Sequence, residues 1–322
     1  MRKIALIVVC TLVIVICFGL AGLTHAKTIA VAHPFATDHP VHQSLLMADK
    51  WLRETSQEKF QFKIYPATTY ATQADSYKAV MLGTLDVANL TNTFNLYKPT
   101  GVFLAPYTFR DYTHWEKFKN SKACEDLFAP AGEIMNVKHL SYFNFGFRHA
   151  TTKKLAAKTP EDFKGFKLRV VNFPPYQEAA TVLGAVGTPI PLAELYMALA
   201  TGVVDGQENP YSQIWTLKFY EQQKYLILTG HMLATDGWMM SKKLWGSLNE
   251  ADKKMVWEAF KKSADFIDAE TIRQETDLLQ KLKEKGLTAI EVDKNPFMER
   301  AKTVLKNYPE WVEPYTQIQA IK

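Results

Sequence analysis

The chain has 322 residues, of which 47% are hydrophobic and 22% are charged, and its formal net charge is +5. This composition is typical of a soluble globular protein, and the length is sufficient for two lobes of ordinary domain size. The charge bias is small and no DNA- or RNA-binding motif is present, so the sequence gives no indication of a nucleic-acid partner.

The N-terminus has the features of an export signal. Arg2 and Lys3 precede an apolar run over residues 4–23, and a small-x-small sequence ending at Ala26 follows. We therefore expect cleavage after Ala26 and a periplasmic protein. An uncleaved membrane anchor is the alternative, because the apolar run is long enough to span a bilayer. Beyond this segment Cys124 is the only cysteine, which excludes an intrachain disulfide in the mature chain.

The first part of the mature chain alternates strands and helices. From apolar alternation and helical periodicity we expect strands at 28–32, 60–65 and 85–90, and helices at 39–55 and 75–82. This order predicts a parallel sheet with right-handed crossovers. Ligands bind beyond the carboxyl ends of such strands, which makes three loops candidates for the binding site: 33–39, 68–73 and 89–92. His33 and Asn92 enter the candidate set from these loops.

A long strand at 139–151 is expected to cross into a second lobe. Further strands are expected at 167–171, 203–207, 224–229, 236–241 and 288–292, and helices at 175–183, 192–201 and from Pro296 onward. The strand at 236–241 is apolar enough to return to the first lobe. Residues 249–285 keep helical periodicity without Pro or Gly, so we expect a helix of about 55 Å that spans both lobes. Several strands join the lobes and no flexible linker is present, which favours a hinge.

Two long motifs lie within residues 159–210: TPEDFKGFKLRVV and PIPLAELYMALATGVVDGQENP. In the first motif, Thr159 and Pro160 suit the start of a helical turn, Gly165 suits its end, and a strand follows. Arg169 lies in the middle of that strand. Its position alone favours a side chain that reaches the surface, and the alternative is that it binds an anion.

The two motifs, in this order and spacing, resemble the periplasmic solute receptors of tripartite ATP-independent periplasmic (TRAP) transporters, the DctP-type family. The resemblance covers most of the mature chain and is weakest in the first lobe. It implies an α/β, two-lobed periplasmic binding protein fold, with a cleft between the lobes and a long helix spanning both. We expect a signal peptide at 1–26, lobe I at 27–146 with 235–274, and lobe II at 147–234 with 275–322.

The resemblance also implies ligand contacts. In the family a strand arginine binds the carboxylate of an organic acid, and Arg169 matches that position; a guanidinium can meet a carboxylate with two parallel hydrogen bonds. By the same resemblance, Arg148 is a second anion contact and Asn209 also contacts the carboxylate. From the residues alone, an edge or inter-lobe salt bridge for Arg148 and a helix cap for Asn209 stay open.

The first lobe departs from the family pattern. Where the family usually has Q-L-G, this chain has Thr69-Tyr70-Ala71, and Gln73 stands at an often acidic position. By resemblance, Tyr70 and Gln73 contact the end of the ligand opposite the carboxylate. Further candidates, for which packing or strand-end capping is the alternative, are Asn89, Asn92, Phe147 and Trp238.

The sequence has no recognisable catalytic motif. G-x-S-x-G, HExxH, G-x-G-x-x-G, P-loop and C-x-x-C patterns do not occur. The histidines within 33–42 match no standard zinc spacing, and Asp205 and Glu208 flank a glycine, where turn and cap roles are more common. We therefore expect no enzymatic activity, no cofactor and no metal.

The sequence predicts an exported receptor that captures a small organic acid. By resemblance, it delivers the acid to a TRAP membrane permease with a small and a large subunit, driven by an ion gradient. Three alternatives stay open: the receptor of an ATP-driven importer, a secreted enzyme acting on an organic acid, and a sensor ectodomain with a retained anchor. The acid itself stays open among C4-dicarboxylates, sugar acids, keto acids and aromatic acids.

Overall fold

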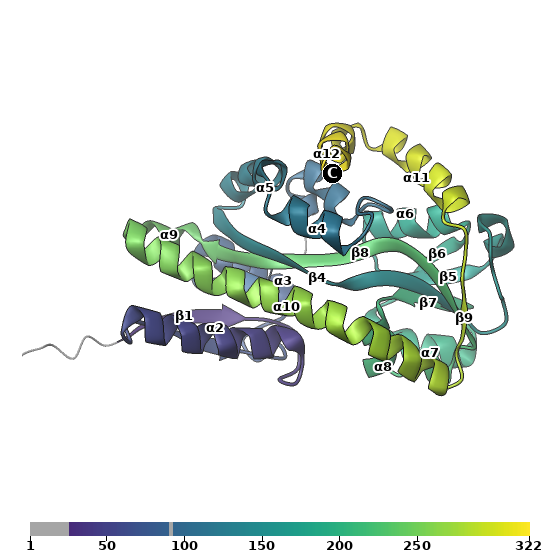
Figure 1. Cartoon of the computed structure of the whole chain (residues 1–322), viewed down its shortest axis with the longest axis horizontal. Helices are drawn as coiled ribbons and strands as arrows, with labels where there is room; N and C mark the ends of the chain where they lie inside the picture. Colours follow the sequence, from purple (N-terminus) through teal and green to yellow (C-terminus); the bar gives the residue numbers. More distant parts are fainter. Residues whose placement is uncertain (1–25, 90–92) are drawn as a thin grey trace, which may run out of the picture.

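A nine-stranded sheet extends through both lobes of the protein (Figure 1). The computed structural model describes residues 26–89 and 93–322, so the expected signal segment, except Ala26, lies outside the described residues. The strand order is β2-β1-β3-β8-β4-β7-β5-β6, and β9 pairs with β8. The predicted two-lobed α/β fold is confirmed. In the described ranges, none of the helices combines the length and the apolar character that a bilayer crossing requires.

Lobe I begins with the predicted parallel sheet. β1 pairs in parallel with both β2 and β3, and the intervening helices start and end within about two residues of the predicted bounds. Their bounds are β1 Lys27–Ala32, α2 Pro40–Ser56, β2 Phe60–Tyr65, α3 Gln73–Leu82 and β3 Val87–Asn89. The carboxyl ends of β1 and β3 therefore lie at the same edge of the sheet. The candidate binding loops were predicted at this edge.

The two lobes are joined by a pair of long antiparallel strands, β4 (Val137–Thr152) and β8 (Tyr225–Ser241). Their pairing contains register shifts, including one between Asn144 and Phe147, which bend the ribbon between the lobes. Separate strands were predicted at 224–229 and 236–241. The structure shows one strand, because the intervening residues are also buried and extended.

Lobe II contains three short strands beside β4. β5 (Lys167–Val170) pairs in parallel with β6 (Val186–Pro189) and with β7 (Gly206–Asn209), and β7 runs antiparallel to β4. β6 was not predicted, since its Val-Gly-Thr-Pro sequence carries little strand signal. The predicted strand at 203–207 starts later, at Gly206. The helices of this lobe are α6 Pro174–Leu183, α7 Leu192–Thr201 and α8 Tyr211–Thr216.

Residues 93–134, which precede β4, are mostly helical; no elements were predicted for this region. It contains η1 Thr93–Asn95, η2 Lys98–Leu104, α4 Tyr112–Lys119 and α5 Lys122–Ile134. Short helical segments elsewhere are η3 Pro160–Phe163, η4 Phe219–Glu221 and α9 Lys242–Gly246. The phenylalanines and Trp115 of this region form much of the core on this face of β4 and β8.

The predicted long helix is α10 (Glu250–Glu284), which packs on α2 and β4 at one end and on α8 at the other (Figure 1). After β9 (Thr288–Ile290), α11 (Asn295–Asn307) packs on α6, whereas α12 (Pro309–Gln319) packs on η2 and α5. The C-terminal tail thus contacts elements expected in both lobes. The lobe boundaries stay a prediction.

A buried polar cluster fixes α10 to the centre of the long strands. The Asp268 carboxylate accepts hydrogen bonds from Trp115 Nε1 (2.8 Å), from the backbone nitrogen of Asn144 (2.6 Å) and from Lys119 Nζ (2.8 Å). The Lys119 and Asp268 side chains are 4% and 6% exposed, so this ion pair is shielded from water. Burial raises the pKa of Asp268 even beside Lys119, so the hydrogen bonds contribute to holding the charge in place.

Replacement of Asp268 by alanine should destabilise the protein by about 3 kcal/mol, because it leaves Lys119 and the Trp115 indole buried without their acceptor. The measurement is the free energy of unfolding from urea denaturation. Asp126→Ala is the matched control, since Asp126 pairs with Lys122 at the surface and its loss should leave stability nearly unchanged. Equal effects of the two substitutions would contradict a structural role for the buried cluster.

Candidate ligand-binding site

A cavity of about 910 Å³ lies between the two lobes. The loop after β1 contributes to its wall from lobe I, the loops after β5 and β6 contribute from lobe II, and β8 and α10 supply residues from the segments that join the lobes. The prediction that a ligand would meet the loop at 33–39 agrees with this position, because Pro34, Phe35, Ala36, Asp38 and His39 all line the cavity.

Arg169 is brought to the cavity by β5, where it is only 2% exposed. Its Nε donates a hydrogen bond to the backbone oxygen of Ile190 at 2.8 Å. Its Nη1 is buried and has no hydrogen-bond partner among the described residues. Burial lowers the pKa of Arg169 to about 10, so the side chain remains charged at neutral pH. A buried cation with an unfilled donor favours an anion as its missing partner.

The second arginine, Arg148, already has an internal counter-ion. Arg148 Nε lies 2.5 Å from Glu208 Oε2, and its Nη2 lies 2.9 Å from Oε1 and 3.0 Å from Asn209 Oδ1. The Tyr176 ring lies 4.9 Å from the guanidinium carbon. Since Glu208 is on β7, next to β4, the salt bridge foreseen as an alternative exists within lobe II and does not connect the lobes.

The charge on Glu208 depends on this pairing. Glu208 is fully buried, and burial alone would raise its pKa, but Arg148 and His231 lower it to about 2. His231 Nε2 lies 3.2 Å from Glu208 Oε2. The Arg148–Glu208 pair is therefore close to neutral overall. Within residues 26–89 and 93–322, Arg169 is the arginine of the cavity wall that has no paired carboxylate.

The structure brings together some of the predicted site residues. Arg148, Arg169, Asn209 and Gln73 line the cavity. Asn209 uses its amide to hold Arg148 and to donate to the Gln207 side chain, so neither of its contacts is a cap on α8. Asn92 lies outside the described residues. The assignment of these residues to ligand contacts stays a prediction.

Other predicted residues do not line the cavity. Tyr70 is 38% exposed and packs edge-on against Tyr65, and His33 is buried with its Nε2 3.1 Å from His42 Nδ1. Trp238 is fully buried in the core of lobe I, because it alternates to the face of β8 that α10 covers, and its Nε1 donates to Ser263. Phe147 packs against Tyr112.

Sequence reasoning missed several residues that line the cavity. Tyr176 lies in the first turn of α6, the helix that follows the Arg169 strand, and Asp236 is the one acidic residue of the apolar strand β8. Their places after a strand end and within an apolar strand are features of the sequence that could have identified them. Phe145 on β4 also lines the cavity, and its ring packs against Phe35 and His39 of the predicted loop, with centroids 5.2 Å and 6.0 Å away. Phe145 comes from a distant part of the chain, so no local pattern predicts its place at the cavity.

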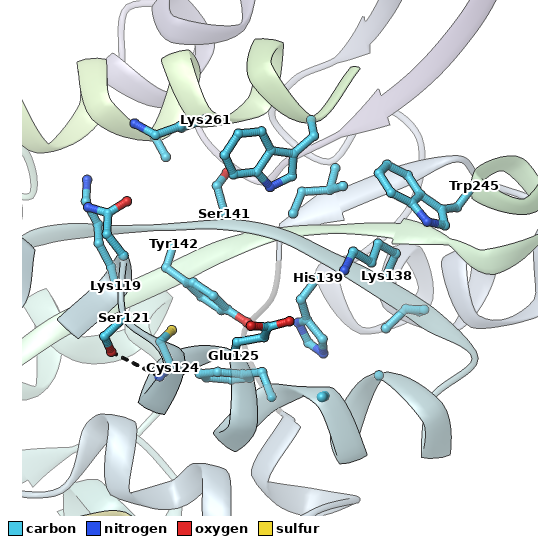
Figure 2. Close-up of a pocket in the computed structure, with 18 of the residues that line it drawn as sticks. Lys119, Ser121, Cys124, Glu125, Lys138, His139, Ser141, Tyr142, Trp245 and Lys261 are labelled. Carbon is cyan, nitrogen blue, oxygen red and sulfur yellow. Dashed lines mark hydrogen bonds between the residues drawn. The ribbon is translucent and has the colours of Figure 1, made fainter. Parts of the chain in front are cut away.

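A second cavity, of about 760 Å³, lies on the outer face between α5, β4, α9 and α10 (Figure 2). The side chains of His139 and Tyr142 extend from β4 toward α5 in this view. Of the lysines that line it, Lys119, Lys242 and Lys261 are paired with carboxylates, and Lys138 lies over the Trp245 ring. The cavity around Arg169 differs in having a buried guanidinium nitrogen without a hydrogen-bond partner among the described residues.

Replacement of Glu208 by glutamine should reduce stability by about 3 kcal/mol at pH 7, because it removes one partner of a buried ion pair and leaves Arg148 buried without its counter-ion. Arg148 and His231 hold the pKa of Glu208 below its ordinary value, at about 2. A depressed acid pKa stabilises the fold above pH 4.5, and this contribution disappears as the pH falls toward 2. Urea unfolding across this range should show the difference between the variant and the parent shrinking with acid. A difference independent of pH would show that the Glu208 charge is not responsible. Glu250→Gln, on an exposed carboxylate, is the control.

The chain is similar to known solute-binding proteins over most of its length. The sialic acid-binding periplasmic protein SiaP of Vibrio cholerae is 28% identical over 92% of this chain and 93% of its own. Two crystal structures of TRAP periplasmic solute binding proteins, each with a TM-score of 0.82, cover 92% of this chain and 99% of theirs. One, from Bordetella bronchiseptica, is 28% identical and has density interpreted as pantoate; the other, from Polaromonas, is 26% identical and is bound to D-erythronate.

These relatives are solute-binding proteins, so the prediction of a receptor rather than an enzyme is confirmed, as is the resemblance to TRAP receptors. Residues 31–310 match the family described as bacterial extracellular solute-binding protein, family 7. This match covers most of the chain, and the chain therefore belongs to that family.

Proposed function

We propose that this protein is an extracytoplasmic receptor that binds a small organic acid between its lobes and delivers it to a TRAP-type permease. Family membership supports the receptor role. The observation that carries the choice of ligand is the buried Arg169 Nη1, which lacks a hydrogen-bond partner within the described residues. A carboxylate oxygen at this atom would supply both the missing acceptor and the missing counter-charge.

The names and ligands of the relatives support an acidic ligand for this chain. The Vibrio cholerae protein is named for sialic acid, and the two crystal structures are described with pantoate and D-erythronate. All three are organic acids with a carboxylate. The likeness supports a carboxylate ligand for this chain.

Closure of the lobes around the acid is the conformational step of this proposal. The register shift near Asn144 and the long β4–β8 pair provide a place where the lobes can bend relative to each other. A ligand that contacts both lobes stabilises the closed state, because it binds that state more tightly than the open one. The permease would then distinguish loaded from empty receptor by the closed shape.

Arg169→Ala should weaken binding of the acid by about two to four orders of magnitude, because a buried carboxylate loses its paired cation. Arg169→Lys should recover only part of the affinity, since an ammonium cannot make the two parallel contacts of a guanidinium. The acid is first identified by mass spectrometry of the molecule released from the purified protein. Calorimetric titration of the parent and both variants with that acid then measures the change.

Arg300→Ala is the matched control, because Arg300 belongs to α11 and its side chain is 42% exposed. The control should bind the acid normally. Both Arg169 variants should also remain folded without ligand in thermal melts, since the residue contributes one internal hydrogen bond. Near-normal affinity in Arg169→Ala would contradict the proposed role and would move the carboxylate site to Arg148 or elsewhere.

Export by a cleaved signal peptide also belongs to this proposal. β1 begins at Lys27, directly after the expected cleavage site, and the backbone nitrogen of Lys27 donates to the Lys59 oxygen at 2.7 Å. Cleavage after Ala26 would therefore leave the first strand complete. Intact-mass measurement of the exported protein should give a chain that starts at Lys27. A mass that includes residues 1–26 would instead favour a retained anchor.

A further inference from the structure

The bend between the lobes contains a tyrosine hydroxyl that is bound from two sides. Tyr112 is the first residue of α4, and its hydroxyl donates a hydrogen bond to Glu275 Oε1 on α10. The same oxygen accepts a hydrogen bond from the backbone nitrogen of Phe147 on β4 at 3.3 Å. One side chain therefore joins α4, α10 and β4 at a single point.

This point coincides with the register shift between Asn144 and Phe147. Gly146, which lies between them, has a φ of +100°, a backbone conformation that favours glycine. A Cβ atom at this glycine would lie 3.4 Å from Glu275 Oε1 and 3.5 Å from the Tyr112 hydroxyl oxygen. Both oxygens therefore pack directly on the bent backbone.

The backbone before the bend is held by two other side chains of α10. Asp268 accepts a hydrogen bond from the backbone nitrogen of Asn144 at 2.6 Å, and Thr271 Oγ1 donates to the Asn144 oxygen at 3.1 Å. Asp268, Thr271 and Glu275 are spaced by three and four residues, so they lie on one face of the helix. This face of α10 follows β4 through the whole bend.

The predicted lobe boundaries pass through this cluster. Phe147 and Glu275 are the first residues of lobe II on the two segments that carry them, whereas Tyr112 belongs to lobe I. α4, which carries Tyr112, packs on α5 and β4. The two hydrogen bonds of the Tyr112 hydroxyl therefore connect the lobes, and a change in the bend moves both partners relative to Tyr112.

The cavity between the lobes is larger than a small organic acid needs. Its volume of about 910 Å³ is in the range typical of pockets for drug-sized ligands. The protein can cover most of the surface of a bound acid only if the lobes come closer, and the register shift is a place where they can bend. The arrangement of the lobes in this structure is therefore an open one, and the Tyr112 hydroxyl makes both of its hydrogen bonds in it.

We propose that Tyr112 is a positioning residue that stabilises the open arrangement of the empty receptor, and that closure breaks at least one of its two hydrogen bonds. This inference rests on the proposed function, because it assumes that the lobes close around the acid. Hydrogen bonds that exist in only one of two states shift the equilibrium toward that state. Tyr112 therefore lowers the fraction of receptor that closes without a ligand, which keeps the empty site accessible.

Tyr112→Phe tests this role, because it removes only the hydroxyl and keeps the ring that packs against Phe147. The probe is the acid released from the purified protein, titrated by calorimetry after the protein has been unfolded and refolded to remove it. The variant should bind this acid about tenfold more tightly than the parent, since one hydrogen bond changes the closed-to-open ratio by about that factor. Tyr112 does not line the cavity, and damage to the fold would weaken binding, so tighter binding is specific for the proposed role.

The distance between two spin labels measures the arrangement of the lobes without any acid. Leu46→Cys on α2 and Ala193→Cys on α7 are exposed label positions, and the first turns of these helices border the cavity from opposite lobes. Cys124 is buried and should stay unlabelled. In the empty Tyr112→Phe protein, the ratio of molecules with the shorter, closed distance to molecules with the open one should increase about tenfold.

Glu275→Ala should increase the closed population of the empty protein as well, because it removes the acceptor of the Tyr112 hydroxyl. Combining it with Tyr112→Phe should change the distances little further, since both substitutions remove the same contact. Tyr196→Phe is the matched control: Tyr196 on α7 donates its hydroxyl to Glu221, within lobe II. Its affinity and distances should equal those of the parent. Melting curves establish that each variant is folded.

The outcomes separate this inference from the proposed function. If the acid shortens the distance in the parent, but folded Tyr112→Phe binds no more tightly or keeps the parent distances when empty, the inference is overturned and the receptor proposal stands. If the acid leaves the distance in the parent unchanged, the closure step and this inference both fail. If no acid is released or Tyr112→Phe does not fold, the distances in empty Tyr112→Phe or Glu275→Ala decide, and an unchanged closed population overturns the inference.

Discussion

The neighbours of the buried Arg169 guanidinium fix its position and leave one of its hydrogen-bond donors without an acceptor among the described residues. Its Nε is held by the Ile190 oxygen, and its Nη1 is left without a partner in the described residues. Glu208 lies close enough to influence its pKa, but the Glu208 oxygens are bound by Arg148 and His231. If Glu208 turned to Arg169, it would fill the Nη1 donor that has no partner among the described residues. The Arg148–Glu208 pair therefore keeps Arg169 available for a ligand.

The rest of the fold places this cation opposite a second lobe. β4 and β8 continue from one lobe to the other, and α10 lies along them, fixed near the middle by Asp268. Such a frame is stiff within each lobe, because both ends of α10 pack on helices, and it can bend where the register shifts. A ligand bound between the lobes would then meet groups from both sides, Arg169 from lobe II and the loop after β1 from lobe I.

Much of the fold was predictable because its elements carry strong local patterns. The alternating strands of lobe I, the long helix and the strand that carries Arg169 were recognised from periodicity and from helix-start and helix-end residues. β6 and the helices at 112–134 were missed: β6 has four residues, including a glycine and a proline, and the second region was left unassigned. The two strands predicted at 224–229 and 236–241 form one strand, β8, because the residues between them are buried by the rest of the fold. A local sequence pattern does not reveal this burial.

The candidate site was predictable only in part, because a local sequence pattern does not show which side chains meet in the folded chain. Arg169, Arg148, Asn209 and Gln73 reach the cavity from positions that a motif or a strand end indicated. Trp238 was a further candidate with packing as the alternative; side chains alternate along a strand, and this one faces the core. The partner of Arg148 could not be chosen from the sequence, since a ligand and Glu208 satisfy the same donors.

A crystal structure of the protein with the acid that accompanies it through purification tests the central claim most directly. The account predicts one ligand carboxylate between the lobes, with an oxygen about 3 Å from Arg169 Nη1 and with Glu208 still bound to Arg148. An acid whose carboxylate lies elsewhere, while Arg169 Nη1 is filled by a protein group, would contradict the account.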